Sequence, residues 1–392
     1  MLVIAAACTG AEPEGPSAAL PSAEGLGPVS GERLLVLMDD GSVVTTSPAG
    51  DEVRSLSRSR GLDVEVRQPV WSPDGHTVAW AELVQEDEGI RSQLVTVDPT
   101  GSGRTEFPVD TATFFLQWDP TSSRIAYLGN FQGSIGMGVA ERGEDGEPVA
   151  RTIVRGQPFY LSWSPEGERL LIHVGTGVLA TLDLEGNLDE VGDRPGIFQA
   201  PVWLPDGRMV YAANVDGEQM LVVRGDGPPK ELVSFRGVIE FVVSPDGRQV
   251  AYRVSEDALG GVSVVDLRSA RSRRVTQAPT SAFHWSPDGS RLLLMTVEDG
   301  APTNHRWMIW DGSSSSRIGH AFLPSPTFLR DYVPFYGQFA QSMTPWSPDG
   351  TSFAFPGLIE DRAGIWVQDV DSQEPEFVLD GGRVVAWSPA TA

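Results

Sequence analysis

Residues that could do chemistry are few and widely spaced in this 392-residue chain. It contains no Gly-x-Ser-x-Gly elbow, no His-Glu-x-x-His pair, no phosphate-binding Gly-Lys-Ser/Thr and no paired cysteines. Asp369 and Asp371 stand two residues apart, but the glycine and the spacing of a calcium-binding loop are missing. The five histidines fall in different parts of the chain: His76, His173, His284, His305 and His320. The sequence therefore predicts no catalytic residue, no metal site and no cofactor.

The single cysteine, Cys8, has the most informative surroundings. Six apolar residues, 2–7, precede it, and residues 9–32 are rich in Ala, Gly, Pro, Ser and Glu. This order resembles a bacterial lipoprotein signal followed by its lipidated cysteine and a flexible tether. The resemblance implies a truncated-looking signal over residues 1–8, lipidation of Cys8, a tether over 9–32 and an extracytoplasmic protein anchored to the cell membrane. The alternative is an ordinary start with a chance cysteine.

The charge balance excludes one class of partner. The chain has 29 basic and 53 acidic residues, for a net charge of -24. A nucleic-acid binder needs a basic surface for phosphate, so we expect no nucleic-acid partner. A strongly acidic surface commonly keeps a protein in solution, because like charges repel one another. We therefore expect the protein to be a monomer.

One five-residue stretch, Trp-Ser-Pro-Asp-Gly, recurs along the chain, and we call it the turn motif. It is complete at Trp71, Trp285 and Trp346. Degenerate copies begin at Trp118, Trp163, Trp203, Val243 and Trp387. Successive copies are 40 to 47 residues apart, except for 61 between Trp285 and Trp346. A period of this size indicates a stacked-repeat architecture.

Each residue of the turn motif favours a reverse turn. Ser suits the first position of a type I turn, Pro the second, Asp the third and Gly the fourth. Apolar, β-rich segments flank every copy, so the turn motif joins two antiparallel strands. A third strand and a short fourth strand follow, and four strands in about 40 residues predict a propeller blade. The repeated tryptophans are predicted to pack between blades rather than to stack on a ligand: Trp71, Trp118, Trp163, Trp203, Trp285, Trp346 and Trp387.

The two ends of the repeat region complement each other. Residues 33–38, 42–47 and 52–56 read as three strands without a turn motif, whereas 383–387 reads as a first strand alone. Together they make one blade shared by both termini. We therefore predict an all-β fold over residues 33–392, a β-propeller of eight four-stranded antiparallel blades with the N- and C-terminal strands in one blade. Six or seven blades follow if a degenerate repeat forms none.

The spacing of 61 residues reflects an aromatic insertion at 321–345. It connects a fourth strand to the next first strand, so it lies on the face opposite the turn motifs, where it could cover the channel mouth. It could be a packed plug that seals the channel or a site for a ligand or partner. In the second case the candidate binding residues are Phe328, Arg330, Asp331, Tyr332, Phe335, Tyr336 and Gln338.

These repeats resemble the WD-like propeller repeats of the TolB type and the propeller domains attached to prolyl oligopeptidase-family hydrolases. The resemblance covers residues 33–387 and implies the fold more specifically than a function. TolB-type propellers are mostly periplasmic or surface proteins that bind other proteins. We therefore expect a non-catalytic cell-envelope lipoprotein that binds a protein partner or acts as a scaffold. The alternative is a propeller hydrolase or lyase acting on an envelope polymer or peptide in the central channel.

Overall fold

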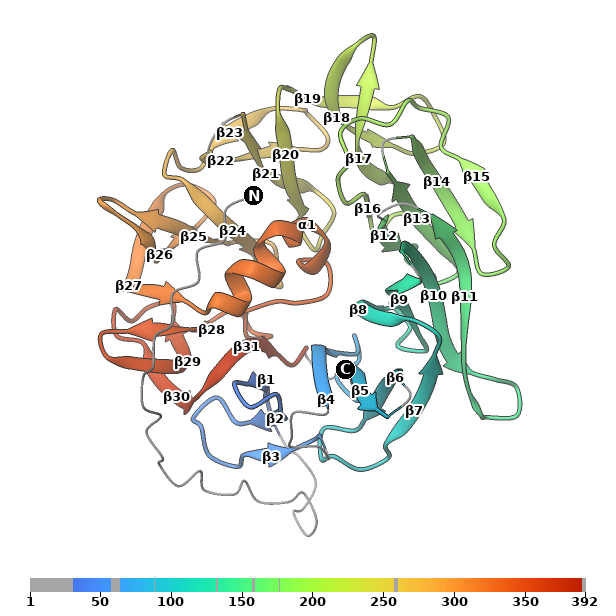
Figure 1. Cartoon of the computed structure of the whole chain (residues 1–392). Helices are drawn as coiled ribbons and strands as arrows, with labels where there is room; N and C mark the ends of the chain where they lie inside the picture. The colour runs from blue at the N-terminus through green and yellow to red at the C-terminus, as the bar shows by residue number, and fades with distance from the viewer. Residues whose placement is uncertain are drawn as a thin grey trace, which may run out of the picture.

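The computed structural model describes residues 31–57, 64–87, 89–131, 133–156, 159–175, 177–256 and 260–389. Cys8 and nearly all of the expected tether lie outside these residues. In the described part of the chain, no helix is long and apolar enough to cross a membrane. Strands dominate, and Figure 1 shows their sheets following one another around a common centre.

Six four-stranded antiparallel sheets contain most of the described strands. The first holds β1 (Leu34–Met38), β2 (Val43–Thr46), β3 (Arg54–Ser55) and β31 (Gly382–Trp387). The second holds β4 (Val64–Trp71), β5 (Val78–Glu86), β6 (Gly89–Val97) and β7 (Thr105–Val109). The third holds β8 (Ala112–Trp118), β9 (Arg124–Phe131), β10 (Ser134–Arg142) and β11 (Pro148–Gly156).

The remaining four-stranded sheets follow the same order along the chain. One holds β12 (Phe159–Trp163), β13 (Arg169–Val174), β14 (Val178–Asp183) and β15 (Leu188–Glu190). The next holds β16 (Val202–Trp203), β17 (Met209–Val215), β18 (Glu218–Arg224) and β19 (Lys230–Phe235). The last holds β20 (Val238–Val243), β21 (Gln249–Ser255), β22 (Val262–Asp266) and β23 (Ser272–Arg274). The prediction of consecutive four-stranded antiparallel units is confirmed here.

A seven-stranded sheet completes the described set. It holds β24 (Thr280–Trp285), β25 (Leu292–Glu298), β26 (Ala301–Trp310), β27 (Ser315–Pro324), β28 (Ser352–Ile359), β29 (Arg362–Asp369) and β30 (Glu376–Asp380). The long β27 joins its two halves through the pairs Leu323–Leu358 and Pro324–Gly357. The first strand expected at Trp346 is reduced to one isolated bridge to Phe353. Pro345, directly before Trp346, has no N–H to donate to a ladder there.

The turn motif folds through side-chain bonds within the turn. Ser72 donates its hydroxyl to Asp74 Oδ1 at 2.6 Å and accepts the Thr77 N–H at 3.0 Å. Gly75 N–H donates to Ser72 O at 2.9 Å, and its φ of 71° is one that glycine adopts most readily. The same hydroxyl-to-carboxylate bond recurs in the turns that begin at Ser244, Ser286 and Ser347. In these four copies the turn therefore reverses the chain, and at Ser72, Ser244 and Ser286 it joins the first two strands of a unit.

The N- and C-terminal strands pair in one sheet, as the sequence predicted. The order of that sheet is β3-β2-β1-β31, and Leu34 lies opposite Trp387. Both strands are almost wholly buried. Because β31 supplies the innermost strand, a contact between the two ends of the described chain closes the ring of sheets.

Most motif tryptophans lie in the core between sheets. Trp71, Trp118, Trp163, Trp285, Trp346 and Trp387 are buried, whereas Trp203 is half-buried. The indole N–H of Trp285 donates to Val242 O of the preceding sheet at 3.1 Å. Trp203 instead donates to Gly207 O in its own turn. The tryptophan positions thus contribute unequally to contacts between sheets.

Candidate functional site

The insertion at 321–345 forms short helices inside the ring. They are a π-helix over Phe328–Tyr332, a 3-10 turn over Val333–Phe335 and α1 over Tyr336–Phe339. Figure 1 shows this orange segment across the centre of the ring rather than on its rim. Its aromatic side chains reach inner strands of different sheets, with the Phe339 ring 5.3 Å from Phe115 and the Tyr336 ring 5.2 Å from Phe283. The insertion therefore packs as part of the core.

Polar side chains of the insertion pair with the backbone of the inner strands. Gln338 accepts the Leu161 N–H and donates to Leu161 O, both at 2.8 Å. Tyr336 Oη accepts the Phe283 N–H at 3.0 Å. Leu161 and Phe283 each stand two residues before a motif tryptophan, on strands whose inner edge faces no further strand. The insertion thus supplies hydrogen bonds that the innermost strands would otherwise lack.

A glutamine outside the insertion makes the same kind of contact. Gln68 donates to Leu116 O at 2.8 Å and accepts the Leu116 N–H at 2.6 Å. Leu116 is the residue two before Trp118, so it matches Leu161 in its repeat. Gln68 has a φ of 47° and stands at a register shift in β4. A bulge in β4 therefore turns this amide toward the neighbouring inner strand.

A cavity of about 700 Å³ opens beside the insertion, and we call it the inner cavity. Its walls come from the first residues of β4, β8, β12 and β31 and from the insertion. Inner strands begin at the end of the sheet opposite the turn motifs, so the inner cavity lies on the face that the sequence assigned to the insertion. A cavity of this size, walled by several elements, suits a ligand or an inserted side chain of a partner.

Aromatic side chains dominate the accessible wall. Phe335 exposes 52% of its surface and Phe114 exposes 37%. The rings of Tyr160 and Phe198 pack against each other at a tilt, with centroids 4.4 Å apart. Exposed aromatic rings grouped around a hollow are typical of binding surfaces, because burying them on contact is favourable.

Charged groups form pairs at the same cavity. Arg67 binds Glu65 at 2.8 Å, and Arg330 binds Asp331 through bonds of 2.7 and 2.8 Å. Arg383 also lines the cavity. The two ion pairs are partly exposed, so they are suited to orienting a partner more than to holding it tightly.

The candidate binding residues divide into two groups in the structure. Phe335 and Arg330 are exposed at the inner cavity, and Asp331 also lines it. Tyr332, Tyr336 and Gln338 are buried in contacts with the inner strands, and Phe328 is partly buried against the core. Burial raises the pKa of the Tyr332 and Tyr336 hydroxyls. The accessible part of the insertion is therefore centred on Phe335.

Sequence reasoning did not single out the opposite wall of the inner cavity. Arg67, Phe114, Tyr160 and Phe198 all line it. One signal was present, because Phe114 and Tyr160 stand four and three residues before a motif tryptophan. Residues three or four positions before the motif tryptophan, near the start of an inner strand, thus line the cavity in successive repeats.

The histidines form no common site. His284 lies against the Tyr336 ring at 5.4 Å, and burial lowers its pKa to about 4. His305 accepts or donates one bond to Ser281 at 2.9 Å, and both are buried. Within the described residues, no group of three His, Cys, Asp or Glu side chains is placed to hold a metal ion.

No protein-family model matches the chain. It is 22% identical over 331 residues to dipeptidyl-peptidase 5 of Porphyromonas gingivalis, a match covering 77% of this chain and 46% of that protein. It is 30% identical over 110 residues to the Tol-Pal system protein TolB of Anaeromyxobacter dehalogenans, covering 27% of this chain and 25% of TolB. The chain thus spans less than half the length of these two curated relatives.

A solved structure gives the same fold. The β-propeller domain of the Trilobed protease from Pyrococcus furiosus superposes with a TM-score of 0.52 at 14% identity, covering 81% of this chain and 98% of that domain. The chain is therefore a propeller-like protein that resembles TolB and the propellers of peptidases. At this level of identity the likeness concerns the fold, and function has to be argued from the cavity.

Proposed function

We propose that this chain is a non-catalytic binding module of the cell envelope and that the inner cavity receives a protein partner. The observation that carries the proposal is Phe335, which exposes 52% of its surface at the cavity although Tyr332 and Tyr336 of the same insertion are buried in the core. An aromatic anchor in a concave site is the usual centre of a protein interface. The two acidic side chains of the lining, Glu65 and Asp331, are each paired with an arginine, which supports binding over catalysis.

The experiment is site-specific photocrosslinking in cells that make the protein. A benzophenone side chain replaces Phe335, and in a matched control it replaces Ile90, which exposes 63% of its surface on β6 and does not line the cavity. We expect a defined protein adduct from position 335 and none from position 90. Adducts of the same composition from both positions would contradict the proposal.

Point variants test the same site by affinity. Phe335→Ala and Phe114→Ala should each weaken binding of the crosslinked partner by at least about tenfold, because truncating an interface anchor typically costs 2 kcal/mol or more. Ile90→Ala should leave the affinity unchanged. Thermal unfolding of all three variants should match the parent, since these side chains are exposed. Equal affinities for all variants would remove Phe335 from the site.

We also propose a lipid anchor at Cys8, which would hold a monomeric propeller on the outer face of the membrane. The support is the sequence pattern around Cys8. Cys8→Ser should move the protein from the membrane fraction to the soluble fraction and abolish incorporation of labelled fatty acid. Retention of the variant in membranes would contradict the anchor.

Eight blades are the count that we propose for the ring. The six four-stranded sheets give six blades, and the seven-stranded sheet divides into β24 to β27 and β28 to β30. The bridge from Trp346 to Phe353 would then represent the inner strand of the second half. This division rests on the turn motif at Trp346, which stands where an inner strand ends in the other repeats.

A further inference from the structure

A second large hollow lies at the other end of the sheets. It has a volume of about 710 Å³ and is lined by Arg208, Lys230, Gly247, Arg248, Asp266, Leu267 and Arg268. We call it the basic hollow, because four of its lining side chains are cationic and one is acidic. Arg208 and Arg248 follow the first turns of neighbouring sheets, so the hollow is on the turn-motif side, opposite the inner cavity. In a chain of net charge -24, this concentration of cations is unusual.

The same position of two successive repeats supplies two of these cations. Arg208 and Arg248 each come directly after the glycine of their turn. In other repeats that keep this glycine, the next residue is not arginine: His76, Glu168, Ser290 and Thr351. The two arginines therefore converge on one hollow because their sheets are adjacent.

The cations are only partly neutralised by their neighbours. Arg208 binds Asp206 at 2.7 Å, but Arg248 reaches Asp246 only at 3.6 Å and exposes 81% of its side chain. The side chain of Arg268 makes no hydrogen bond or ion pair with any residue that the structure describes. Arg248 and Arg268 are thus available to a ligand.

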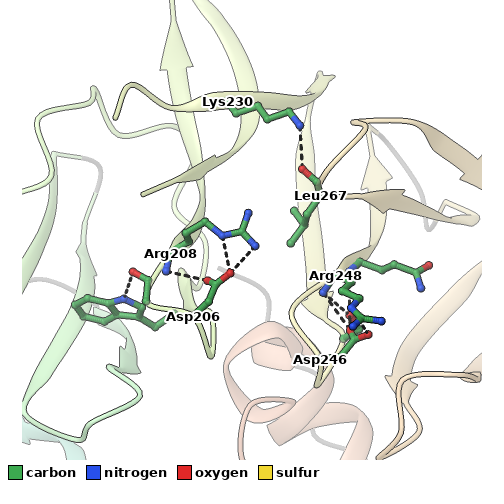
Figure 2. Close-up of polar contacts among 10 residues, drawn as sticks. Asp206, Arg208, Lys230, Asp246, Arg248 and Leu267 are labelled. Carbon is green, nitrogen blue, oxygen red and sulfur yellow. Dashed lines mark hydrogen bonds and ion pairs between the residues drawn. The ribbon is translucent and has the colours of Figure 1, made fainter. Parts of the chain in front are cut away.

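Lys230, the only lysine in the chain, connects the two sheets at this point. Its Nζ donates to the carbonyl oxygen of Leu267 at 3.0 Å and to that of Arg268. Figure 2 shows Lys230 reaching Leu267 across the gap, with Arg208 and Arg248 beside Asp206 and Asp246. These acceptors are neutral, so the ammonium keeps its charge without a carboxylate partner. The two hydrogen bonds from Lys230 also fix the turn that carries Arg268.

The one acidic side chain of the lining is already occupied. Asp266 accepts the N–H of Ser269 at 2.6 Å and its hydroxyl at 2.7 Å, within its own turn. These bonds, together with the nearby positive charge of Arg268, lower the pKa of Asp266. The carboxylate is therefore directed into its turn, and the balance of charge around the hollow remains positive.

We propose that the basic hollow binds a phosphate-bearing anion with at least two negative charges. The guanidinium group matches phosphate oxygens through paired N–H donors, and lysine adds a point charge. Donors from three separate turns approach from different directions, which suits the several oxygens of a phosphate better than the two of a planar carboxylate. The volume has room for more than one phosphate group.

The test is calorimetric titration of the full chain with pyrophosphate at low ionic strength. We expect saturable binding that weakens as salt is added. Arg248→Gln combined with Arg268→Gln should reduce the affinity by at least about tenfold, because charge-assisted bonds are lost. The control, Arg91→Gln with Arg169→Gln, removes the same charge from exposed ion pairs elsewhere. Phe335→Ala should have no effect, which separates this site from the inner cavity.

A second arm identifies the source of the phosphate. Cosedimentation with cardiolipin vesicles, whose headgroup carries two phosphates, compared with neutral phosphatidylcholine vesicles, tests a lipid headgroup. Sedimentation that depends on Arg248 and Arg268 assigns the site to a lipid, whereas pyrophosphate binding without sedimentation assigns it to a free phosphate compound. No saturable pyrophosphate binding by the parent protein, or equal weakening in the control variant, would overturn the proposal.

Discussion

At the scale of single residues, indole hydrogen bonds link one sheet to the next in a repeating way. Trp163, Trp285 and Trp346 donate to Gln117 O, Val242 O and His284 O. Each acceptor is the residue just before the motif position of the preceding repeat. A tryptophan at this position therefore combines apolar burial with a directed bond to the neighbouring inner strand.

Trp285→Ala should lower the free energy of unfolding by about 3 to 5 kcal/mol, the usual cost of emptying a buried tryptophan site. The side chain is buried and packs edge-on against Trp310. Trp203→Ala is the matched control, because that ring is half-buried and its N–H stays within its own turn. Denaturant unfolding should show a clearly smaller loss for Trp203→Ala. Similar losses of stability in both variants would contradict the idea that the Trp285 indole stabilises the contact between neighbouring sheets.

At the scale of elements, the strands were largely predictable and the helices of the insertion were not. A reverse turn followed by an apolar strand is a local signal, so the turn motif at Trp71 predicts both the turn and β5. The insertion showed Phe328, Tyr332 and Phe339 at helical spacings of four and seven residues. Pro334 obscured this signal, since proline in the middle of a helical pattern breaks it. The structure accommodates Pro334 in the 3-10 turn between the other two helices.

The inner cavity shows a different limit of prediction. Phe335 could be selected from the sequence as an aromatic residue of the insertion, but Phe114 and Phe198 come from repeats far away in the chain. Their proximity depends on how inner strands of several sheets surround the insertion. No local pattern encodes that arrangement. The buried role of Gln338 is also non-local, because its partner Leu161 is 177 positions away in sequence.

Gln338→Leu should destabilise the contact between α1 and β12. The substitution leaves the buried N–H of Leu161 without a partner, which costs about 1 to 3 kcal/mol, and leaves its C=O with only the 3.4 Å bond from Gln341. Gln341→Leu is the control, since the bonds of Gln341 are all 3.4 Å or longer. Hydrogen exchange of the Leu161 amide should accelerate in the first variant and not in the second. An unchanged Leu161 amide would show that Gln338 does not hold the insertion in place.

At the scale of the whole molecule, the ring closes through a copy of the turn motif divided between the chain ends. Trp387-Ser388-Pro389 supplies the first half of the motif. Gly31-Glu32-Arg33 supplies the second half, and its sequence matches Gly167-Glu168-Arg169 in the unbroken turn of another repeat. Ser388 N–H donates to Arg33 O at 2.8 Å, and Arg33 N–H donates to the Ser388 hydroxyl at 3.0 Å. Ser164 and Arg169 make the same two bonds within an unbroken turn. Gly31 also has the positive φ of the motif glycine, 83°.

A circular permutant should therefore fold. One aspartate inserted between Pro389 and Gly31 would complete Trp-Ser-Pro-Asp-Gly, and new ends would be opened between Pro287 and Asp288 in the corresponding turn. The strands and their partners stay the same, and the new ends lie in a turn, where breaks are best tolerated. We expect the permutant to have the same circular dichroism spectrum as the unpermuted chain of residues 31–389. Its melting temperature should lie within a few degrees of that chain's. As a control, opening the chain inside β25, at Leu293, should prevent folding, because both flanking ladders would be cut. If the permutant also fails to fold while the unpermuted 31–389 chain folds, the two ends do more than rebuild an ordinary turn.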